Sequence, residues 1–450
     1  MKHVSDLSRL GLFDAKVPRF TSYPPANWFS DSVDADCTRA WRSDAPKDAE
    51  ISLYVHIPFC RRLCWFCACR TQGTRNDAPL APYVDRILTE ARDVRAQFAN
   101  GVAPRRLHLG GGTPTILSAA LLDKMLSGLD EIWWLETLEE FSVEVDPTDV
   151  GPGRLDMLKS HGLSRASLGI QDFDPQVQDA IGRTQSHELT QGVVDQLRDR
   201  GIEALNFDLL YGLPFQNART LDATLKAALD MQPSRIALFG YAHVPWMSKR
   251  QVLISSDAVP TPKTRLALFD HARRTLLGQG YVQIGIDHFA LPHDPLAKAF
   301  FAKTLKRSFQ GYTDDRAPYL IGLGASAIST YPDGFAQNIP VTGQYANKID
   351  TGEATIWRGY ALNARDHLKA DLVEQLMCYH SADLSEAQRA DTELMGDIDR
   401  VADHFDGAIS WDGQTLSINR WAHPLVRLIA VQLVTPSAAT SGERTYSAAI

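Results

Sequence analysis

The sequence predicts an α/β fold: a partial parallel (β/α)6 barrel, preceded by an N-terminal arm and followed by a small, mainly helical C-terminal domain. Two observations carry this prediction. From residue 52 to about residue 245, six apolar runs with strand character alternate with amphipathic segments of helical period. After about residue 360 the pattern changes to helices and one hairpin. Alternating strands and helices favour a parallel sheet that curves into a full or partial barrel.

The predicted strands are short runs rich in β-branched, aromatic and leucine residues. We expect them to be apolar on both faces, as strands of a covered parallel sheet generally are. They span residues 52–58, 105–112, 140–147, 165–173, 204–214 and 235–245. Further apolar runs follow between residues 281 and 345.

Amphipathic segments between the strands are predicted to be helices. They span residues 83–99, 119–134, 188–201 and 220–233. Three residues are suited to cap helix starts, because their hydroxyl oxygens accept hydrogen bonds from the free N–H groups of a first turn: Ser118, Ser186 and Thr220.

The chain divides into three predicted parts. Residues 1–48 are loop-like and form an arm over the barrel mouth. Its segment 17–25 (VPRFTSYPP) is either a lid or, as we expect, an arm packed on the rim. Residues 49–350 form the barrel, and residues 351–450 form the helical domain.

The C-terminal domain combines helices with a hairpin, which suggests a winged-helix-like unit. Asp412 and Gly413 form a strong turn signal between two strand-like runs. A last helix is predicted from residue 423 onward. The acidic run from Asp383 to Asp406 argues against DNA and favours a covering or packing role.

Composition excludes several classes of function. The 450 residues carry 46 basic and 54 acidic side chains, a net charge of −8, so no nucleic-acid partner is expected. No apolar run is long enough to span a membrane. The N-terminus lacks the apolar stretch of a secretory signal. With reduced cysteines expected, these features predict a cytoplasmic protein, and nothing demands a partner chain, so we expect a monomer.

Four of the six cysteines lie in one ten-residue run, CRRLCWFCAC, after the first predicted strand. Cys60, Cys64, Cys67 and Cys69 are too closely spaced to pair as disulfides without strain, which favours soft-metal ligation. The spacing C-x3-C-x2-C suits a 4Fe–4S cluster held by three thiolates, whose fourth iron stays open to a ligand.

Structural zinc and a redox couple are alternative readings of the same run. Structural zinc usually needs a second cysteine pair or histidines at metal spacing, and Cys37 and Cys378 are isolated. A thioredoxin-like couple would not need the first and fourth cysteines. The cluster is therefore favoured over zinc, and zinc over a redox couple. Cys69 either ligates the cluster or lines the site.

Polar and glycine residues follow the predicted strands, at the edge where a parallel barrel gathers its ligands. The glycine run 110–115 (GGGTPT) allows amide N–H groups to approach an anion closely. Glu144 is placed to bind an amine, or forms a structural salt bridge. Asp208 suits ribose hydroxyls or an amine. Arg183 pairs with a carboxylate or is a solvated helix residue.

These features fit S-adenosylmethionine bound to an open cluster iron, and the chain resembles the radical S-adenosylmethionine superfamily. Within it, the sequence is similar to the oxygen-independent coproporphyrinogen III oxidase family. The matching stretches run from about residue 18 to residue 340, and include PRFTSYP, YVHIPFCRRLCWFCAC, LHLGGGTPT, SVEVDP, NFDLLYGLP and FQGYT. Two positions depart from the expected pattern, Ala68 and Arg70, and so does the C-terminal segment.

The resemblance implies a barrel of radical SAM type, a 4Fe–4S cluster and two molecules of S-adenosylmethionine. It implies that Cys60, Cys64 and Cys67 hold the cluster and that Cys69 and Tyr54 act in catalysis. The first S-adenosylmethionine would contact Tyr54, Gly111, Glu144 and Ile328. The second would contact Phe66, Gly112, Thr113, Gln171, Arg183, Asp208 and Ala242.

The implied reaction is the oxygen-independent decarboxylation of two propionate side chains of coproporphyrinogen III to vinyl groups through a 5′-deoxyadenosyl radical. The product would be protoporphyrinogen IX, in heme biosynthesis, and the electron donor a reduced flavodoxin-like or ferredoxin-like protein. The alternatives are a related radical SAM heme chaperone, a heme-modifying methyltransferase, or a non-catalytic carrier. The C-x-C pair and the PRFTSYP arm favour the oxidase over the chaperone.

Overall fold

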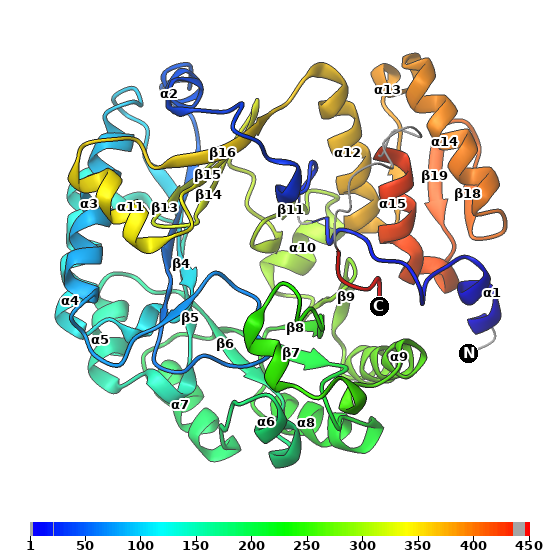
Figure 1. The fold of residues 1–450 in the computed structure, drawn as a ribbon, viewed down its shortest axis with the longest axis horizontal. Helices are drawn as coiled ribbons and strands as arrows, with labels where there is room; N and C mark the ends of the chain where they lie inside the picture. Colours follow the sequence, from blue (N-terminus) through cyan, green and yellow to red (C-terminus); the bar gives the residue numbers. More distant parts are fainter. Residues whose placement is uncertain (1–2, 21, 435–445) are drawn as a thin grey trace.

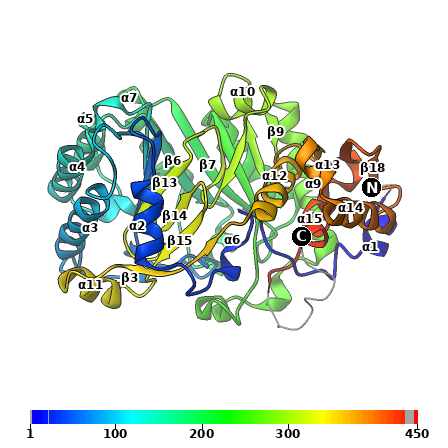
Figure 2. The ribbon, with the colours of Figure 1, turned by 90° about the horizontal axis from the view of Figure 1, so that it is seen from above.

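The computed structural model describes residues 3–20, 22–434 and 446–450. A curved sheet of twelve strands, in the order β16-β15-β14-β13-β1-β4-β5-β6-β7-β8-β10-β9, forms its centre. Helices pack along the outer side of the curve, and the C-terminal helices lie beside its open end (Figure 1). The view from above shows the same strands enclosed by helices on their outer side (Figure 2).

All six predicted strands are present, parallel and adjacent in chain order, which confirms the partial (β/α)6 barrel. Their bounds are β1 (Ile51–Ile57), β4 (Pro104–Gly111), β5 (Glu140–Val145), β6 (Arg165–Gln171), β7 (Ala204–Tyr211) and β8 (Arg235–Gly240).

The sheet continues beyond the six strands on both sides, which the sequence reading did not resolve. On one side β13 (Tyr319–Leu323) pairs parallel with β1, and three antiparallel strands follow: β14 (Ile328–Tyr331), β15 (Gly334–Asn338) and β16 (Ile356–Ala361). On the other side β10 (His288–Ala290) and β9 (Val282–Ile284) pair antiparallel. These additions leave the barrel open rather than closed.

The prediction that the strands are apolar on both faces is wrong. In β5, Phe141 and Val143 pack in the main hydrophobic core with the outer helices, whereas Glu140 and Glu144 alternate with them and make polar contacts. Side chains alternate between the two faces of a strand. Helices cover only the outer face, so the inner face is free to carry polar groups.

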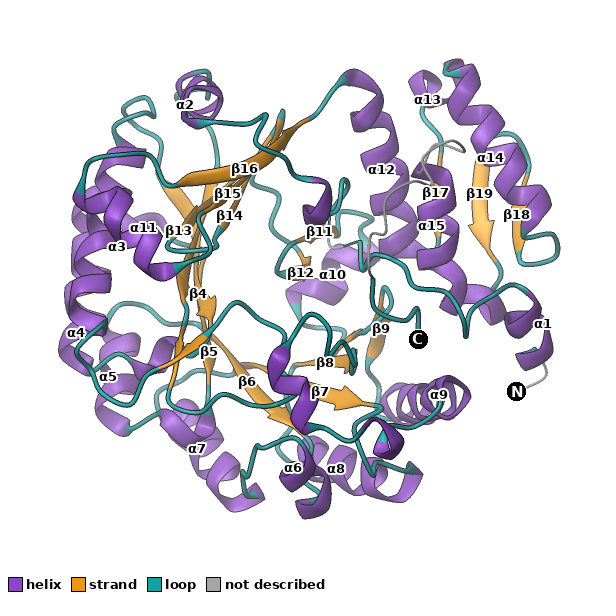
Figure 3. Ribbon diagram, viewed as in Figure 1, coloured by secondary structure: helices purple, strands orange, loops and turns teal. Residues whose placement is uncertain are grey.

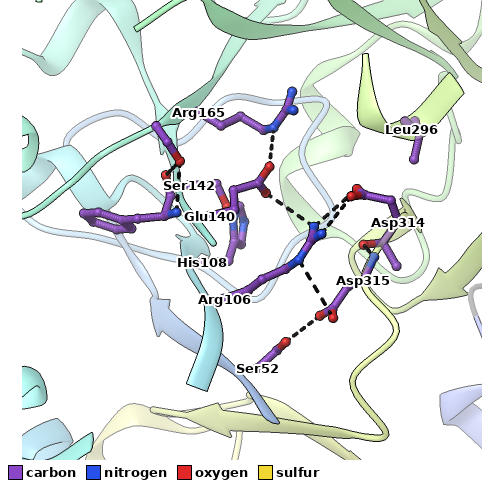
Figure 4. Close-up of polar contacts among 12 residues, drawn as sticks. Ser52, Arg106, His108, Glu140, Ser142, Arg165, Leu296, Asp314 and Asp315 are labelled. Carbon is purple, nitrogen blue, oxygen red and sulfur yellow. Dashed lines mark hydrogen bonds and ion pairs between the residues drawn. The ribbon is translucent and has the colours of Figure 1, made fainter. Parts of the chain in front are cut away.

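The polar inner face forms a charged network near the amino ends of the strands (Figure 4). Arg106 in β4 makes a bidentate pair with Asp314, at 3.2 and 2.7 Å. Arg165 in β6 donates to Glu140 in β5 at 2.8 Å. Each buried charge has an opposite partner, as burial requires. This network occupies the end of the barrel opposite the predicted ligand edge.

The helices of the barrel follow the strands as predicted, with one difference at a cap (Figure 3). Their bounds are α3 (Leu80–Arg95), α4 (Ala119–Trp133), α5 (Pro152–Ser160), α6 (Pro175–Ala180), α7 (His187–Asp199), α8 (Ala218–Asp230) and α9 (Pro262–Gly278). Ser118 and Ser186 cap α4 and α7, which confirms those predictions. Thr220 is not the cap of α8: Asn217 is, and Thr220 completes a capping box three residues later.

The C-terminal part is mainly helical, as predicted. It contains α12 (Ala364–Tyr379), α13 (Glu386–Ala390), α14 (Thr392–His404), α15 (Val426–Val434) and a small sheet of β17 (Ser381–Asp383), β19 (Thr415–Ile418) and β18 (Ile409–Trp411). Asp412 accepts from the N–H groups of Gln414 and Thr415 in the predicted hairpin turn.

The prediction of a last helix is confirmed for α15 and is wrong for residues 446–450. Residues 435–445 lie outside the described part, and residues 446–450 contain no helix but include an isolated antiparallel bridge between Ala448 and Lys16. This pairing uses backbone N–H and C=O groups that a helix would satisfy internally.

The N-terminal segment packs against both parts. Leu7, Leu10 and Leu12 lie in a second hydrophobic core with residues of α12, α14 and α15. The elements here are α1 (Val4–Arg9) and α2 (Ala35–Ser43). This packing agrees with an arm rather than a free loop, while the limits 1–48, 49–350 and 351–450 stay predictions.

Several short elements complete the chain. They are β2 (Phe59–Cys60), β3 (Gln72–Gly73), α10 (Pro295–Phe301), β11 (Lys306–Ser308), β12 (Gly311–Thr313) and α11 (Thr342–Asp350). Within the described ranges, no helix is both long enough and apolar enough to cross a membrane.

Candidate active site at the carboxyl ends of the strands

The cysteine loop joins β1 to α3 and is closed at its base by hydrogen bonds. The short strands β2 and β3 pair, the N–H of Gln72 donates to the carbonyl of Pro58 at 2.7 Å, and that of Thr74 to the carbonyl of Cys60 at 3.0 Å. The four cysteines of the loop are all free thiols. The loop is therefore a pinned structure that presents its thiols at the carboxyl end of β1.

Each predicted ligand thiol has a defined neighbour. The Thr113 hydroxyl lies 3.6 Å from Cys60 Sγ. The Arg183 guanidinium lies 3.4 Å from Cys64 Sγ, and the N–H of Cys69 lies 3.4 Å from Cys67 Sγ. Hydrogen bonds and positive charge stabilise thiolates, which are the form that binds metals. The donor set therefore fits an iron–sulfur cluster.

Gly112 explains why the glycine run must lie beside this loop. A Cβ added at Gly112 would lie 3.0 Å from Cys60 Sγ and 2.7 Å from the carbonyl oxygen of Phe59. Those distances are too short for any side chain, so only glycine lets β4 approach the first thiol. Among the described residues, no three His, Cys, Asp or Glu side chains are arranged to hold a single metal ion. A cluster differs in this respect, because it offers a separate iron to each thiolate.

A second segment, which sequence reasoning missed, holds the cysteine loop from the other side of the barrel. It is the short 3-10 helix Lys249–Leu253 with the preceding Ser248. Ser248 donates to the carbonyl of Cys67 at 3.1 Å, and Arg250 donates to the carbonyl of Cys69 at 3.3 Å. Such contacts between a loop and residues about 180 positions away carry no local sequence signal.

Gln251 is the buried centre of this second segment. Its amide nitrogen donates to the carbonyls of Phe66 at 2.8 Å and Ala242 at 3.1 Å. Its amide oxygen accepts from the N–H of Val244 at 2.5 Å. Gln251 is fully buried, so all three bonds form without competition from water. It joins the cysteine loop to the segment that follows β8.

Tyr54, His56 and the cysteine loop are joined by hydrogen bonds whose donors and acceptors can be assigned. His56 Nε2 lies 3.3 Å from the carbonyl of Arg70, which can only accept, so Nε2 carries the proton. Burial lowers the pKa of His56, which keeps the ring neutral and leaves Nδ1 as an acceptor. The Tyr54 hydroxyl, 2.9 Å away, therefore donates to His56.

Glu144 lies next to this chain and is held as a carboxylate. It accepts from the N–H of Gly111 at 3.0 Å, and His108 Nε2 lies 3.6 Å away. Burial raises the pKa of Glu144, but His108 and the Gly111 N–H outweigh it, so the pKa falls below its usual value. Tyr54 stacks on His108 with ring centres 5.7 Å apart. An ionised carboxylate at this position suits a ligand amine.

Ile328 joins the same half of the mouth through the sheet register. Tyr54 of β1 pairs with Gly322 of β13. A Cβ at Gly322 would lie 2.7 Å from the carbonyl of Ile328, so the two backbones are in close contact. Tyr54, Gly111, Glu144 and Ile328 are thus gathered on one side.

Arg183 is a buried ion-pair residue, not a solvated helix residue. It lies 3.3 Å from each carboxylate oxygen of Asp146 and donates to the carbonyl of Gly169 at 2.7 Å. Gln171, at the end of β6, has a φ of 70°. A non-glycine residue in this region is uncommon, and such strain gathers at functional sites.

Asp208 lies within β7 rather than at its end, and its carboxyl group is hydrogen-bonded to neighbouring side chains. Ser167 and Asn206 donate to its carboxyl group at 3.2 and 2.9 Å. Burial, and next the charge of Glu144, raise its pKa to about 7. Asp172, by contrast, is fully buried and accepts from Thr224 and Gln216, so it has a structural role outside the mouth.

The predicted residues therefore fall into two halves of one mouth. One half contains Tyr54, Gly111, Glu144 and Ile328. The other contains Gln171 on β6, Asp208 on β7 and Arg183 in the loop between α6 and α7. It also contains Phe66 and Ala242, which Gln251 joins. Gly112 and Thr113 lie between the halves, against Cys60.

A pinned thiol loop at the mouth of an open parallel barrel, faced by a carboxylate and by glycine backbone, defines a radical SAM enzyme. The Radical SAM superfamily matches residues 54–228 of the chain. The chain is 48% identical over 454 residues to an oxygen-independent coproporphyrinogen III oxidase of Paracoccus denitrificans, with 100% of both chains covered. It is 46% identical to one of Cereibacter sphaeroides, with 96% of each covered.

The solved structure of coproporphyrinogen III oxidase from Escherichia coli, described as a radical SAM enzyme, matches with a TM-score of 0.87 at 33% identity. The match covers 93% of this chain and 97% of that one. The chain belongs to the oxygen-independent coproporphyrinogen III oxidase family, which confirms the resemblance. It is an oxidoreductase whose cofactors are a 4Fe–4S cluster and S-adenosylmethionine.

Proposed function

We propose that this chain converts coproporphyrinogen III to protoporphyrinogen IX by oxidative decarboxylation of two propionate side chains to vinyl groups. The observation that carries the proposal is the meeting of the cysteine loop and the Glu144 network at one mouth, in a chain 48% identical to a named oxidase. When bound, the cluster and S-adenosylmethionine supply the one-electron chemistry that removes hydrogen from an unactivated C–H bond.

The residues of the first half would hold the cluster and orient the first S-adenosylmethionine. Cys60, Cys64 and Cys67 bind the cluster. Glu144 accepts from the ligand amine, and Gly111 lets the ligand approach the backbone of β4. Tyr54 keeps its proton, because burial, and next the charge of Glu144, raise its pKa well above the usual value.

The second half would bind the second S-adenosylmethionine between Phe66 and Ala242, with Gly112, Thr113, Gln171, Arg183 and Asp208 around it. Gln251 supports this assignment, because it fixes the spacing between Phe66 and Ala242. Asp208 suits ribose hydroxyls, since a carboxyl group near its pKa both donates and accepts hydrogen bonds.

Cys69 would act in catalysis rather than bind the cluster. It lines a large cavity with Ala242 and His243, where a substrate would meet the site. A thiol at this boundary can give or take a hydrogen atom or proton.

We also propose a monomer in the cytoplasm, reduced by a flavodoxin-like or ferredoxin-like donor. The cysteine usage supports the compartment, since all six thiols are free, as in reducing environments.

Anaerobic reconstitution tests the function. The protein is loaded with iron and sulfide, then given reductant, S-adenosylmethionine and coproporphyrinogen III. Vinylated porphyrinogen with 5′-deoxyadenosine is the expected result. Absence of both products would overturn the proposal. 5′-Deoxyadenosine without decarboxylation would favour the heme chaperone or the methyltransferase branch.

A further inference from the structure

A cavity of about 920 Å³ opens between the barrel mouth and the C-terminal part. Its lining includes Cys69 and Ala242 from the barrel mouth, and Arg420 and Arg427 from the C-terminal part. Aromatic walls are supplied by Tyr211, Phe239, Phe269 and Phe309. The volume is near the upper end of the roughly 300–1,000 Å³ typical of small-molecule sites. It suits a large, flat ligand.

Positive charge is concentrated in this cavity, in a chain whose net charge is −8. Its walls carry six arginines and two aspartates, an excess of four positive side chains. The arginines are Arg19, Arg265, Arg273, Arg307, Arg420 and Arg427. One of the aspartates, Asp287, is already engaged by His288 at 2.7 Å. A cleft lined by an excess of positive charge attracts anionic ligands.

Most of these arginines form no close ion pair with a carboxylate of the described residues. Within the described residues, ion pairs under 4 Å are absent for Arg19, Arg265, Arg307, Arg420 and Arg427. Arg265 is buried, Arg307 and Arg427 are half-buried, and Arg19 and Arg420 are exposed. An unpaired charge is costly to bury, so the unpaired Arg265 in particular calls for an anionic partner. Burial lowers the pKa of Arg265, and burial together with the charge of Arg19 lowers that of Arg427 to about 9.

Backbone carbonyls hold two of these arginines in place. Arg265 Nε and Arg307 Nη1 are buried and have no hydrogen-bond partner among the described residues. Arg265 Nη2 donates to the carbonyl of Tyr241, and Arg307 Nε donates to that of Phe20 at 2.7 Å. Both guanidinium groups are thus fixed in place on the cavity wall, where they supply positive charge. Carboxylates match them well, since arginine binds them in a planar, bidentate manner.

We propose that this cavity binds the tetrapyrrole substrate, and that its arginines hold the propionate carboxylates. This inference rests on the proposed function and adds the residues that bind the substrate. The macrocycle lies among the aromatic walls. The reacting propionate is directed toward Cys69 and Ala242, and the others are held by Arg265, Arg307 and their neighbours.

Binding of two stable probes to the anaerobically reconstituted enzyme tests the inference. The probes are coproporphyrin III, which carries four carboxylates, and its tetramethyl ester, which carries none. Arg265→Gln and Arg420→Gln should each raise the Kd for the tetracarboxylate about tenfold, because each removes a charge-assisted bond. The ester should bind wild type and variants equally. Arg219→Gln, on the outer helix α8, is the matched control and should change nothing.

Iron content and melting temperature establish that the variants fold. Arg420 is exposed and keeps the test decisive if Arg265→Gln does not fold. A Kd within twofold of wild type in the folded variants, or an equal effect in Arg219→Gln, would overturn the inference. Product formation is measured separately. If the enzyme forms vinylated product but the arginine variants bind the probe as wild type does, the cavity is not the substrate site. If the enzyme binds the probe but forms no vinylated product, the proposed function is wrong.

Discussion

At the scale of single residues, the cysteine loop contains thiols with different surroundings. Cys60 and Cys64 contact Thr113 and Arg183, whereas Cys69 lines the large cavity. We therefore expect Cys64→Ser to lose the cluster, and Cys69→Ser to keep it while turnover falls at least tenfold. Iron and sulfide analysis, with product assays, measures both. An equal loss of iron in the two variants would contradict the division of roles.

The raised pKa of Asp208 predicts that the stability of the folded protein depends on pH. Its pKa is raised to about 7 in the folded protein, by burial and then by Glu144, from about 3.9 in an unfolded chain. Between pH 4 and 7 the folded state holds a proton that the unfolded state has lost, so this group makes stability fall as pH rises. Asp208→Asn cannot ionise. The free energy of unfolding of Asp208→Asn, minus that of wild type, should therefore rise by about 1–3 kcal/mol between pH 4.5 and pH 8.

Denaturant unfolding of the cluster-free protein at the two pH values measures this difference. Asp257→Asn, at an exposed position, is the control and should show no trend. A difference between Asp208→Asn and wild type that stays constant with pH would mean that Asp208 is already ionised when folded.

At the scale of elements, the segment Ser248–Leu253 holds the cysteine loop against the far side of the barrel. Ser248 and Arg250 donate to the carbonyls of Cys67 and Cys69. Removing both side chains in Ser248→Ala/Arg250→Ala should loosen the loop, since each hydrogen bond contributes about 1 kcal/mol. We expect the variant to lose iron to a chelator several-fold faster than wild type, while it still assembles a cluster.

Lys249→Ala is the matched control, because Lys249 is exposed between the two. Absorbance of the cluster followed after chelator addition measures the rate. The same rate in all three proteins would show that the base of the loop, at β2 and β3, is sufficient to hold it.

At the scale of the whole molecule, three parts distant in the chain enclose the arginine-lined cavity. Arg19 comes from the arm, Arg265 from α9 of the barrel, and Arg427 from α15. Arg427 also holds the arm, because it donates to the carbonyls of Val17 at 2.6 Å and Pro18 at 2.9 Å. The arm is therefore part of the substrate enclosure and is held to the C-terminal part.

The arm should loosen when its buried anchor is removed. Leu12 is fully buried in the second hydrophobic core, so Leu12→Ala should cost about 2–5 kcal/mol of local stability. We expect faster proteolysis of the arm and weaker coproporphyrin III binding, with the cluster unchanged. Ser8→Ala, on the exposed side of α1, should match wild type. Unchanged proteolysis in Leu12→Ala would mean that Arg427 alone holds the arm.

Features that depend on local pattern were predictable. The six strands and two of the three proposed caps follow from periodicity and from hydroxyl positions, and the structure has them. The polar inner faces of the strands were visible as alternation in runs such as Glu140–Val145, but the expectation of a doubly apolar parallel strand hid them. The apolar runs that form β13 and β14 were visible, but their place in the sheet was missed because β13 pairs with β1, some 270 positions earlier in the chain.

The sequence by itself determined the class of chemistry, because cysteine spacing, glycine runs and strand order are local properties, and they also identify the family. The tertiary structure decided which residues act together. Gln251 reaches Phe66 across 185 positions, and Arg427 reaches Val17 across 410. Such contacts arise from the curvature of the sheet and the packing of the arm, which no local pattern encodes.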